Sequence, residues 1–174
     1  MHPKDTIKYE ISFRKPTTFG KEMLRKGVNY LKVIKLGKSE MRNQSEVKLY
    51  FEQKLPQLSP KGRFDVTGGK SPYISDLRVG ETLVFTHSGK ILLVAKSAST
   101  RCISEDPRGF TELGEPAEYP HYFLIDLDSI IWLAEPIHRY SLSEHLPRKI
   151  DGPAWQSFTE EEYETANKRC GLNL

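Results

Sequence analysis

Two short triplets that pair a glutamate with a lysine are the residues in this sequence that most resemble catalytic machinery. Glu46-x-Lys48 and Glu52-x-Lys54 have the spacing found in the second half of a nuclease metal motif. Such a motif needs a further carboxylate shortly upstream, because Mg²⁺ is held by several oxygen ligands. The only preceding aspartate is Asp5. We therefore interpret both triplets as solvated ion pairs and keep a metal-dependent nuclease as an alternative.

The triplet Gly69-Lys70-Ser71 resembles the end of a phosphate-binding loop. The complete motif also requires a glycine at position 64, where the chain has Phe64, and a helix after the serine, where Pro72 stands. The sequence therefore does not predict a nucleotide-hydrolysing site.

The histidines and serines show no catalytic spacing either. His138 and His145 are seven residues apart, with no obvious third metal ligand between them. A zinc deaminase would need an H-x-E and a P-C-x-x-C motif, and both are missing. Ser88 and Ser99 lack the flanking residues of a nucleophile elbow. We predict no catalytic residue, no metal and no cofactor, and therefore a binding protein rather than an enzyme.

Charge is divided unevenly along the chain. Residues 1–70 contain 16 Lys or Arg against 7 Asp or Glu, whereas residues 71–174 contain 10 against 16. The net charge of +3 thus combines a basic segment of +9 with an acidic segment of −6. A basic surface attracts phosphate backbones, so we expect nucleic acid as the partner. The alternative is a lysine-rich surface that is only solvated.

Length and composition predict one domain over residues 1–174. Cys102 and Cys170 are far apart and in no C-x-x-C pair, which favours two reduced thiols. Charges interrupt every apolar run, and none approaches the roughly 20 residues of a membrane span. Residues 1–13 lack the apolar region of a signal peptide. We therefore expect a soluble cytoplasmic protein with no membrane partner.

The spacing of apolar residues predicts the first elements of the fold. Residues 7–13 alternate between apolar and polar side chains, which is strand periodicity, and residues 30–36 are a second strand candidate. Residues 17–26 fit a short helix that ends at Gly27. Residues 45–55 fit a strand or a helix equally well, so periodicity leaves both open.

The strongest local signal is a β-hairpin in the middle of the chain. Residues 81–87 and 90–97 are apolar and β-rich, and Ser88-Gly89 between them forms a tight turn in which Gly89 takes a positive φ. Because both runs are almost continuously apolar, we expect both faces of the hairpin to be covered.

The second half of the chain predicts further strands and two capped helices. Short strands are expected at residues 64–66, 122–125 and 130–133, and residues 100–120 read as a long irregular acidic stretch. Two capping boxes predict helices that begin after Ser141 and after Thr159, with Glu144 and Glu162 as the second residue of each box.

The stretch LRVGETLVFTHSGKILLVAK, residues 77–96, is similar to the signature of PUA-like domains, in particular the EVE and YTH-related branch. Those proteins carry an "lkvGD" turn, a strand that ends in an "fYhS" type of sequence, and an "iVGiAkv" strand. Here Gly80-Glu81 replaces Gly-Asp, and Thr86 stands at the tyrosine position. Residues 122–136 also resemble the later strands of the family.

The resemblance implies an α+β fold built as a small distorted PUA-like (EVE-type) β-barrel with flanking helices. The barrel would span residues 28–174, and residues 1–27 would form an N-terminal extension. The resemblance also implies a pocket for a base, often a modified one, that is flipped out of a nucleic acid. Aromatic faces stack on such a base, polar groups read its edge, and basic residues hold the phosphates.

We expect the base pocket to combine residues after the first barrel strand, residues around the hairpin and two aromatic residues. These are Lys35, Gly37, Ser39, Tyr73, Ile74, Ser75, His87, Ser88, Tyr119 and Trp132. For Trp132 the alternative is a place in the core, and for His87 it is a cap on the hairpin. Phosphate contacts are expected from basic residues in the first half of the chain, namely Lys38, Lys54, Lys61, Arg63 and Lys70.

We therefore predict a nucleic-acid-binding module without catalysis, and in the first place a reader of a flipped base in DNA. A nuclease or another defence protein would be its protein partner. Two alternatives stay open: an RNA-binding PUA-like module, and a protein-interaction domain that uses the acidic stretch 100–120. That stretch would repel nucleic acid if it lay near the pocket mouth.

Overall fold

The computed structural model describes residues 29–38, 40–139 and 156–159, together with residues 161, 162, 164, 165 and 168. Several predicted features lie outside these residues. They are the strand at 7–13, the helix at 17–26, the capping box of Ser141 and Glu144, and Cys170.

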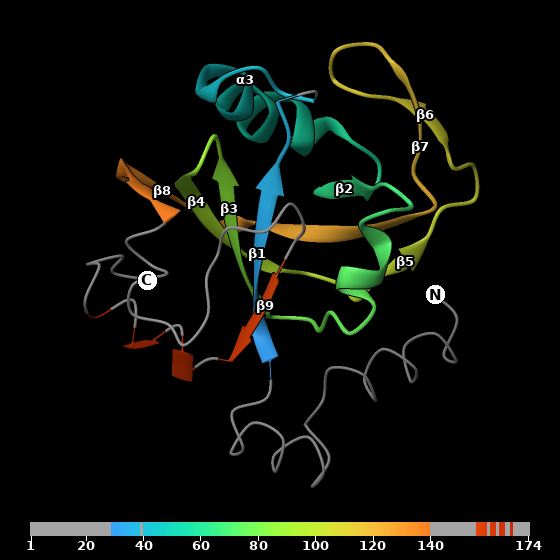
Figure 1. Cartoon of the computed structure of the whole chain (residues 1–174). Helices are drawn as coiled ribbons and strands as arrows, with labels where there is room; N and C mark the ends of the chain where they lie inside the picture. Colours follow the sequence, from blue (N-terminus) through green and yellow to red (C-terminus); the bar gives the residue numbers. More distant parts are fainter. Residues whose placement is uncertain are drawn as a thin grey trace, which may run out of the picture.

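A mixed β-sheet is the centre of the described structure (Figure 1). Its strands follow the order β2-β8-β4-β3-β1-β9, and β5 pairs with β8 outside this path. β1 runs parallel to β3, and the other pairings are antiparallel. The strands are β1 (Asn29–Leu36), β2 (Arg63–Val66), β3 (Thr82–His87), β4 (Lys90–Ser97), β5 (Cys102–Ile103), β8 (His121–His138) and β9 (Gln156–Thr159).

The predicted hairpin is confirmed as β3 and β4. Leu83 and Phe85 on one face and Val84 on the other are completely buried in it, in agreement with the expectation that both faces are covered. The turn places Ser88 at φ 50 and Gly89 at φ 78, so both central residues are left-handed. This is the backbone of a type I′ turn, whose twist matches that of the flanking strands.

The two strands predicted at residues 122–125 and 130–133 are one long strand, β8. The polar residues between them do not leave the strand but accompany a shift of register against β4. The Ser129 hydroxyl accepts a hydrogen bond from the backbone N–H of Lys96 (2.7 Å) and donates one to the carbonyl of Asp126 (2.6 Å). A side chain thus takes over backbone hydrogen bonding at a bulge, which the apolar pattern does not reveal.

The ambiguous segment 45–55 is helical. It consists of α3 (Gln44–Leu49), the π-helical turn η1 (Tyr50–Lys54) and the 3₁₀ turn η2 (Leu55–Gln57). The side chain of Asn43 caps α3 by accepting from the N–H of Glu46 at 2.9 Å. Burial of Val47, Phe51 and Leu55 explains why the segment is helical and not a strand, because residues four apart form one helical face against the sheet.

Aromatic rings join this helical face to the sheet. The Phe51 and Phe85 rings lie 5.0 Å apart, and the Phe64 ring lies 5.7 Å from Phe85 and 5.3 Å from Phe123. These contacts fix the helical segment over the end of β1, where the chain passes from strand to helix through residues 37–43.

The acidic stretch 100–120 is more regular than predicted. It contains β5 and a separate hairpin of β6 (Arg108–Phe110) and β7 (Pro116–Glu118). Gly114 with φ 85 and a hydrogen bond from the Thr111 N–H to the Glu115 carbonyl (2.8 Å) close the turn. Proline and glycine, which made this stretch read as a loop, here occupy a short strand and a turn.

The α+β class is confirmed, since a large mixed sheet, the small β6–β7 sheet and a short helical segment make up the described structure. The sheet begins at β2 and ends at β9, and among the described residues no pairing joins these two strands. The described strands therefore form an open sheet and not the closed barrel that was expected. Within the same residues, no helix is long and apolar enough to cross a membrane.

Gly62 is a position where the fold tolerates only glycine. Its φ is 79, and an added Cβ would lie 2.3 Å from the carbonyl oxygen of Ile125 in β8. Gly62→Ala is expected to lower the free energy of unfolding by about 3 kcal/mol or more, because the strand would have to move. Gly80→Ala is the matched control: its φ is also positive (82), but no atom lies within 4 Å of the added Cβ. Gly80→Ala should lower the free energy of unfolding by only about 1–2 kcal/mol. If urea denaturation shows the same loss for both variants, Gly62 does not approach β8 as closely as described.

Candidate nucleic-acid interface

A cavity of about 630 Å³ lies at the end of β1. We call it the basic cavity. The strand end, the following loop, the hairpin turn and the end of β8 contribute to it. Its described lining residues are Lys35, Leu36, Gly37, Lys38, Lys70, Ser88, Gly89, His138 and Arg139.

The sheet register brings these segments together. Parallel pairing of β1 with β3 ends both strands at the hairpin turn, and the pairing of Lys90 with His138 carries the end of β8 to the same place. The Arg139 N–H then donates to the Gly89 carbonyl at 2.8 Å. A Cβ at Gly89 would lie 3.6 Å from Nε2 of His138, so the turn and the imidazole are in close proximity.

The lining of the basic cavity is strongly positive. Lys35, Lys38, Lys70 and Arg139 carry four positive charges, and no carboxylate is among the described lining residues. The Ser88 hydroxyl and the backbone groups of the glycines add neutral hydrogen-bonding groups. A hollow with one sign of charge focuses its potential and concentrates ligands of the opposite sign. The basic cavity is therefore suited to an anion.

The structure brings five of the sequence-predicted residues together here. They are Lys35, Gly37 and Ser88 from the expected base pocket, and Lys38 and Lys70 from the expected phosphate contacts. Ser39 lies outside the described residues. Sequence reasoning missed His138 and Arg139, since only the pairing of β8 with β4 places them beside the turn. The available signal was a His-Arg pair directly after an apolar strand.

His87 and Ile74 are buried and do not line the basic cavity. His87 is 1% exposed, and its Nε2 lies 2.7 Å from the carbonyl of Met41 while its Nδ1 lies 3.1 Å from the Ser88 hydroxyl. It ties the turn to the loop after β1, which is close to the alternative of a hairpin cap. Ile74 is completely buried in the core.

The expected aromatic and serine members of the pocket lie elsewhere. Trp132 packs edge-on against Phe51 at 6.0 Å, which agrees with its alternative as a core residue, and the ammonium of Lys48 lies 5.8 Å from its ring. Tyr73 is 43% exposed on the 3₁₀ turn η3 (Ser71–Ile74). Ser75 is exposed and donates its hydroxyl to the carbonyl of Pro72.

Three of the expected phosphate-binding residues are also outside the basic cavity. Lys54 forms an ion pair with Glu112 at 2.7 Å. Arg63 forms one with Asp65 at 2.9 Å and lies 4.0 Å from the centre of the Tyr122 ring. Lys61 is exposed.

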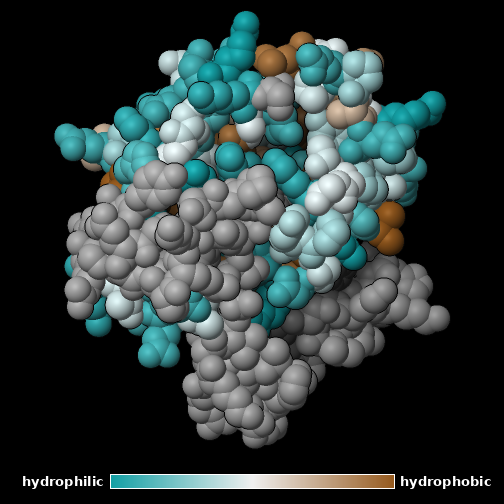
Figure 2. Space-filling view, in the orientation of Figure 1, coloured by the Kyte–Doolittle hydropathy of each residue, from teal (hydrophilic) through white to brown (hydrophobic). Residues whose placement is uncertain are grey.

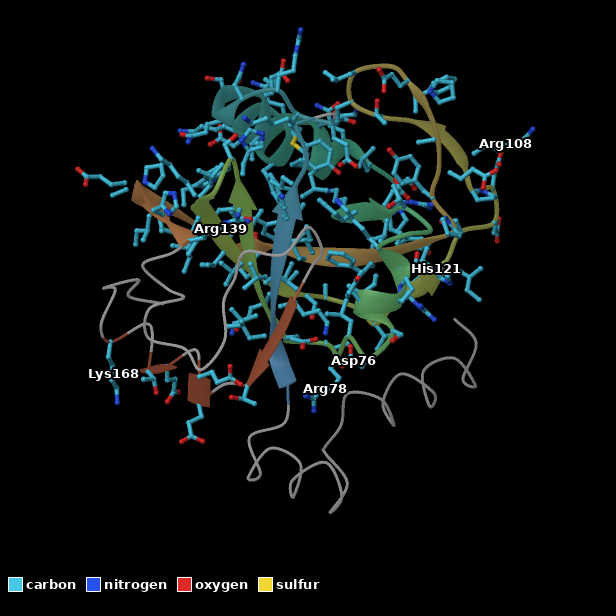
Figure 3. The ribbon with its side chains drawn as sticks, in the orientation of Figure 1. Asp76, Arg78, Arg108, His121, Arg139 and Lys168 are labelled. Atoms are coloured by element: carbon cyan, nitrogen blue, oxygen red, sulfur yellow. The ribbon has the colours of Figure 1, made fainter. Side chains whose placement is uncertain are left out.

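The hairpin of β6 and β7, residues 108–118, does not cover the basic cavity; we call it the acidic hairpin. Figure 3 shows Arg108, on β6, and Arg139, at the end of β8, on opposite sides of the molecule. The repulsion of nucleic acid that the acidic stretch could cause is therefore kept away from the cationic lining.

A second, smaller cavity of about 60 Å³ lies on the other side of the loop that follows β1. We call it the aromatic–acidic cavity. It has four aromatic rings and three carboxylates, and Tyr119 is its only member from the expected base pocket. The described lining residues are Glu40, Met41, Tyr50, Phe64, Asp65, Phe110, Glu112 and Tyr119.

Comparisons with known proteins connect this fold to solved structures but not to a sequence family. No protein-family model and no curated protein sequence matches the chain. Three of the similar structures show the identities, TM-scores and coverages that were found. The YTH domain of the Zygosaccharomyces rouxii MRB1 protein, solved with N6-methyladenosine RNA, is 20% identical, with a TM-score of 0.52 over 79% of this chain and 84% of that one. The YTH domain of Pho92, solved with m6A, is 16% identical with a TM-score of 0.49 over 83% and 84%. The Agrobacterium tumefaciens protein Atu2648 is 13% identical with a TM-score of 0.49 over 81% and 92%.

At these identities the similarity concerns the fold alone. It agrees with the resemblance that residues 77–96 show to the YTH-related branch, because the same residues form the end of the loop before β3, the hairpin and most of β4. The chain thus has a fold similar to that of the YTH domain from Zygosaccharomyces rouxii.

Proposed function

We propose that this protein binds single-stranded RNA and holds one nucleotide in the basic cavity, without catalysis. The observation that carries the proposal is the convergence of Lys35, Lys38, Lys70 and Arg139 on one hollow with no carboxylate among its described lining residues. Phosphate contacts of this kind supply most of the affinity of proteins for nucleic acid.

The dimensions of the basic cavity suit a nucleotide. Its volume of about 630 Å³ lies within the range of about 300–1,000 Å³ that is usual for small-molecule sites. The imidazole of His138 is the only ring among the described lining residues and offers a face for stacking. The Ser88 hydroxyl and the backbone at Gly37 and Gly89 provide groups that can read a base edge.

RNA is favoured over DNA by the fold. The sequence alone led us to expect DNA, whereas the similar domain from Zygosaccharomyces rouxii was solved with N6-methyladenosine RNA. The 2′-hydroxyl is the group by which a protein can distinguish RNA from DNA of the same sequence.

Fluorescence anisotropy with a labelled 9-nucleotide strand tests the proposal. The single-stranded RNA should bind more tightly than DNA of the same sequence, and replacing one adenosine by N6-methyladenosine shows whether a modified base is preferred. If four phosphates are neutralised, log K should fall with log[salt] with a slope of about −3. Affinity that does not change with salt, or tighter binding to DNA, would contradict the proposal.

A further inference from the structure

The aromatic–acidic cavity differs from the basic cavity in both size and charge. Its walls come from the helical segment, from β2 and from the acidic hairpin, which Figure 1 shows beside α3. The ion pair of Lys54 with Glu112 joins the helical segment to the hairpin and so holds this side closed. With about 60 Å³, the cavity accommodates a few water-sized groups and is too small for a nucleobase.

Two polar groups of this cavity, the hydroxyls of Tyr50 and Tyr119, have no hydrogen-bond partner within the described part of the chain. Burial raises the pKa of Glu40, and the nearby Lys70 opposes that rise. Burial and the nearby Glu40, Asp65 and Glu112 raise the pKa of Tyr119 to about 12, and burial with the same carboxylates raises the pKa of Tyr50 further. Burial disfavours a charge of either sign, but the part of these shifts that comes from the carboxylates reflects a negative potential, which a cation would relieve.

We propose that the aromatic–acidic cavity binds the cationic head group of a lysine or arginine side chain from a partner protein. Ring faces attract an ammonium or guanidinium group through their quadrupoles. The carboxylates of Asp65 and Glu112 add Coulomb attraction, which the incoming cation shares with Arg63 and Lys54. RNA is not a candidate for this cavity, because its phosphates would meet the three carboxylates. The site is thus independent of the proposed RNA-binding function.

A groove of mixed polarity next to the cavity indicates what surrounds the basic residue in the partner. The groove has a volume of about 410 Å³ and shares Met41, Tyr50 and Glu112 with the aromatic–acidic cavity. Leu49 (53% exposed) and Leu113 (38% exposed) are its exposed apolar members, and its other lining residues are mostly polar or charged. Apolar patches of this kind appear at the top of the mostly hydrophilic face in Figure 2. The fitting ligand is a segment with a basic residue next to an apolar one.

The acidic hairpin supplies complementary charge around this site. Glu105, Glu115 and Glu118 are exposed on it, and Phe110 at the cavity is 69% exposed. Exposed carboxylates around an apolar centre attract basic segments and speed their association. The partner is therefore a basic, partly apolar peptide segment and not a second acidic surface.

Isothermal titration with four 9-residue peptides tests this inference on the full chain. The peptides carry one leucine and, next to it, lysine, trimethyl-lysine, arginine or glutamine. We expect the cationic peptides to bind at least about fivefold more tightly than the glutamine peptide, the gain expected from a cation–π contact. Equal binding of the glutamine peptide would overturn the inference.

Variants locate the binding within the cavity. Glu40→Gln and Glu112→Gln should each weaken the lysine peptide by about fivefold, because each removes one carboxylate from the lining. Glu112→Gln also removes the ion pair with Lys54, whereas Lys54→Gln removes the same pair and keeps the carboxylate, so Lys54→Gln should not weaken the binding of the lysine peptide. Glu115→Gln, on the same hairpin but outside the cavity, is the control. Its affinity for the lysine peptide should stay within about twofold of that of the unchanged protein. If the three glutamate variants bind alike, the cavity is not the site. RNA affinity, measured in parallel, should not fall in any of them; Glu40→Gln can only raise it, because Glu40 interacts with Lys70 of the basic cavity.

Discussion

Replacement of Lys32 by methionine is expected to lower the free energy of unfolding by about 3 kcal/mol, the loss usual when one partner of a buried ion pair is removed. Lys32 is completely buried in β1, with its Nζ 2.9 Å from Asp76 and 3.8 Å from Glu81. Oε1 of Glu81 is buried and has no hydrogen-bond partner, so the lysine is the cation that compensates this carboxylate. Burial raises the pKa of Glu81, and Lys32 opposes that rise.

A double variant separates lost charge compensation from lost packing. Lys32→Met combined with Glu81→Gln should recover a large part of the lost stability, because no uncompensated buried carboxylate remains. Lys90→Met is the control on an exposed lysine and should change stability by no more than about 0.5 kcal/mol. Thermal and urea unfolding measure all three. We call Lys32, Asp76 and Glu81 the ion cluster. If the single and the double variant lose the same stability, Lys32 does not compensate the charge of Glu81.

The ion cluster serves the fold and not the proposed RNA site. Figure 3 shows Asp76 and Arg78 at the lower end of the sheet, away from Arg139 at the end of β8. Variants of the cluster should therefore change stability without changing RNA affinity at temperatures where the protein is folded.

Charge reversal in the basic cavity is expected to have the largest effect on RNA binding. Lys35→Glu combined with Arg139→Glu removes two of the four cations and adds two like charges to the site. The affinity for single-stranded RNA should fall by roughly 100-fold at low salt. With two phosphate contacts left, the slope of log K against log[salt] should shrink to about −1.5.

A matched double variant controls for net charge. Lys48→Glu combined with Lys61→Glu changes the net charge by the same amount, but neither residue lines the basic cavity. Its RNA affinity should fall far less, by about threefold or less, because distant surface charges are screened. Melting temperatures of both variants show whether they are folded. If the two lose the same affinity, binding depends on overall charge and not on this cavity.

Local patterns predicted the central elements of this fold. The Ser88-Gly89 turn between two apolar runs predicted the β3–β4 hairpin, and the strand expected at residues 30–36 is β1. The segment 45–55 could not be assigned, because its period fits two structures, and packing of Phe51 against Phe85 decides for the helix. The open sheet was not foreseen, since strand order depends on pairings between distant residues.

The candidate site followed from sequence only in part. Lys35, Gly37 and Ser88 were expected in one pocket because of the resemblance to PUA-like domains, and they do line one cavity. His138 and Arg139 were missed because β8 was predicted as two strands, which hid where its end lies. The three carboxylates of the aromatic–acidic cavity come from three separate segments, so no local motif announced them.

Titration of ¹⁵N-labelled protein with the 9-nucleotide RNA, followed by NMR, tests the central claim most directly. Binding in the basic cavity predicts that the amide shifts concentrate at Gly37, Lys38, Ser88, Gly89 and Arg139. Shifts that concentrate on the β6–β7 hairpin, or none at concentrations where the RNA binds, would contradict the assignment of this cavity as the RNA site.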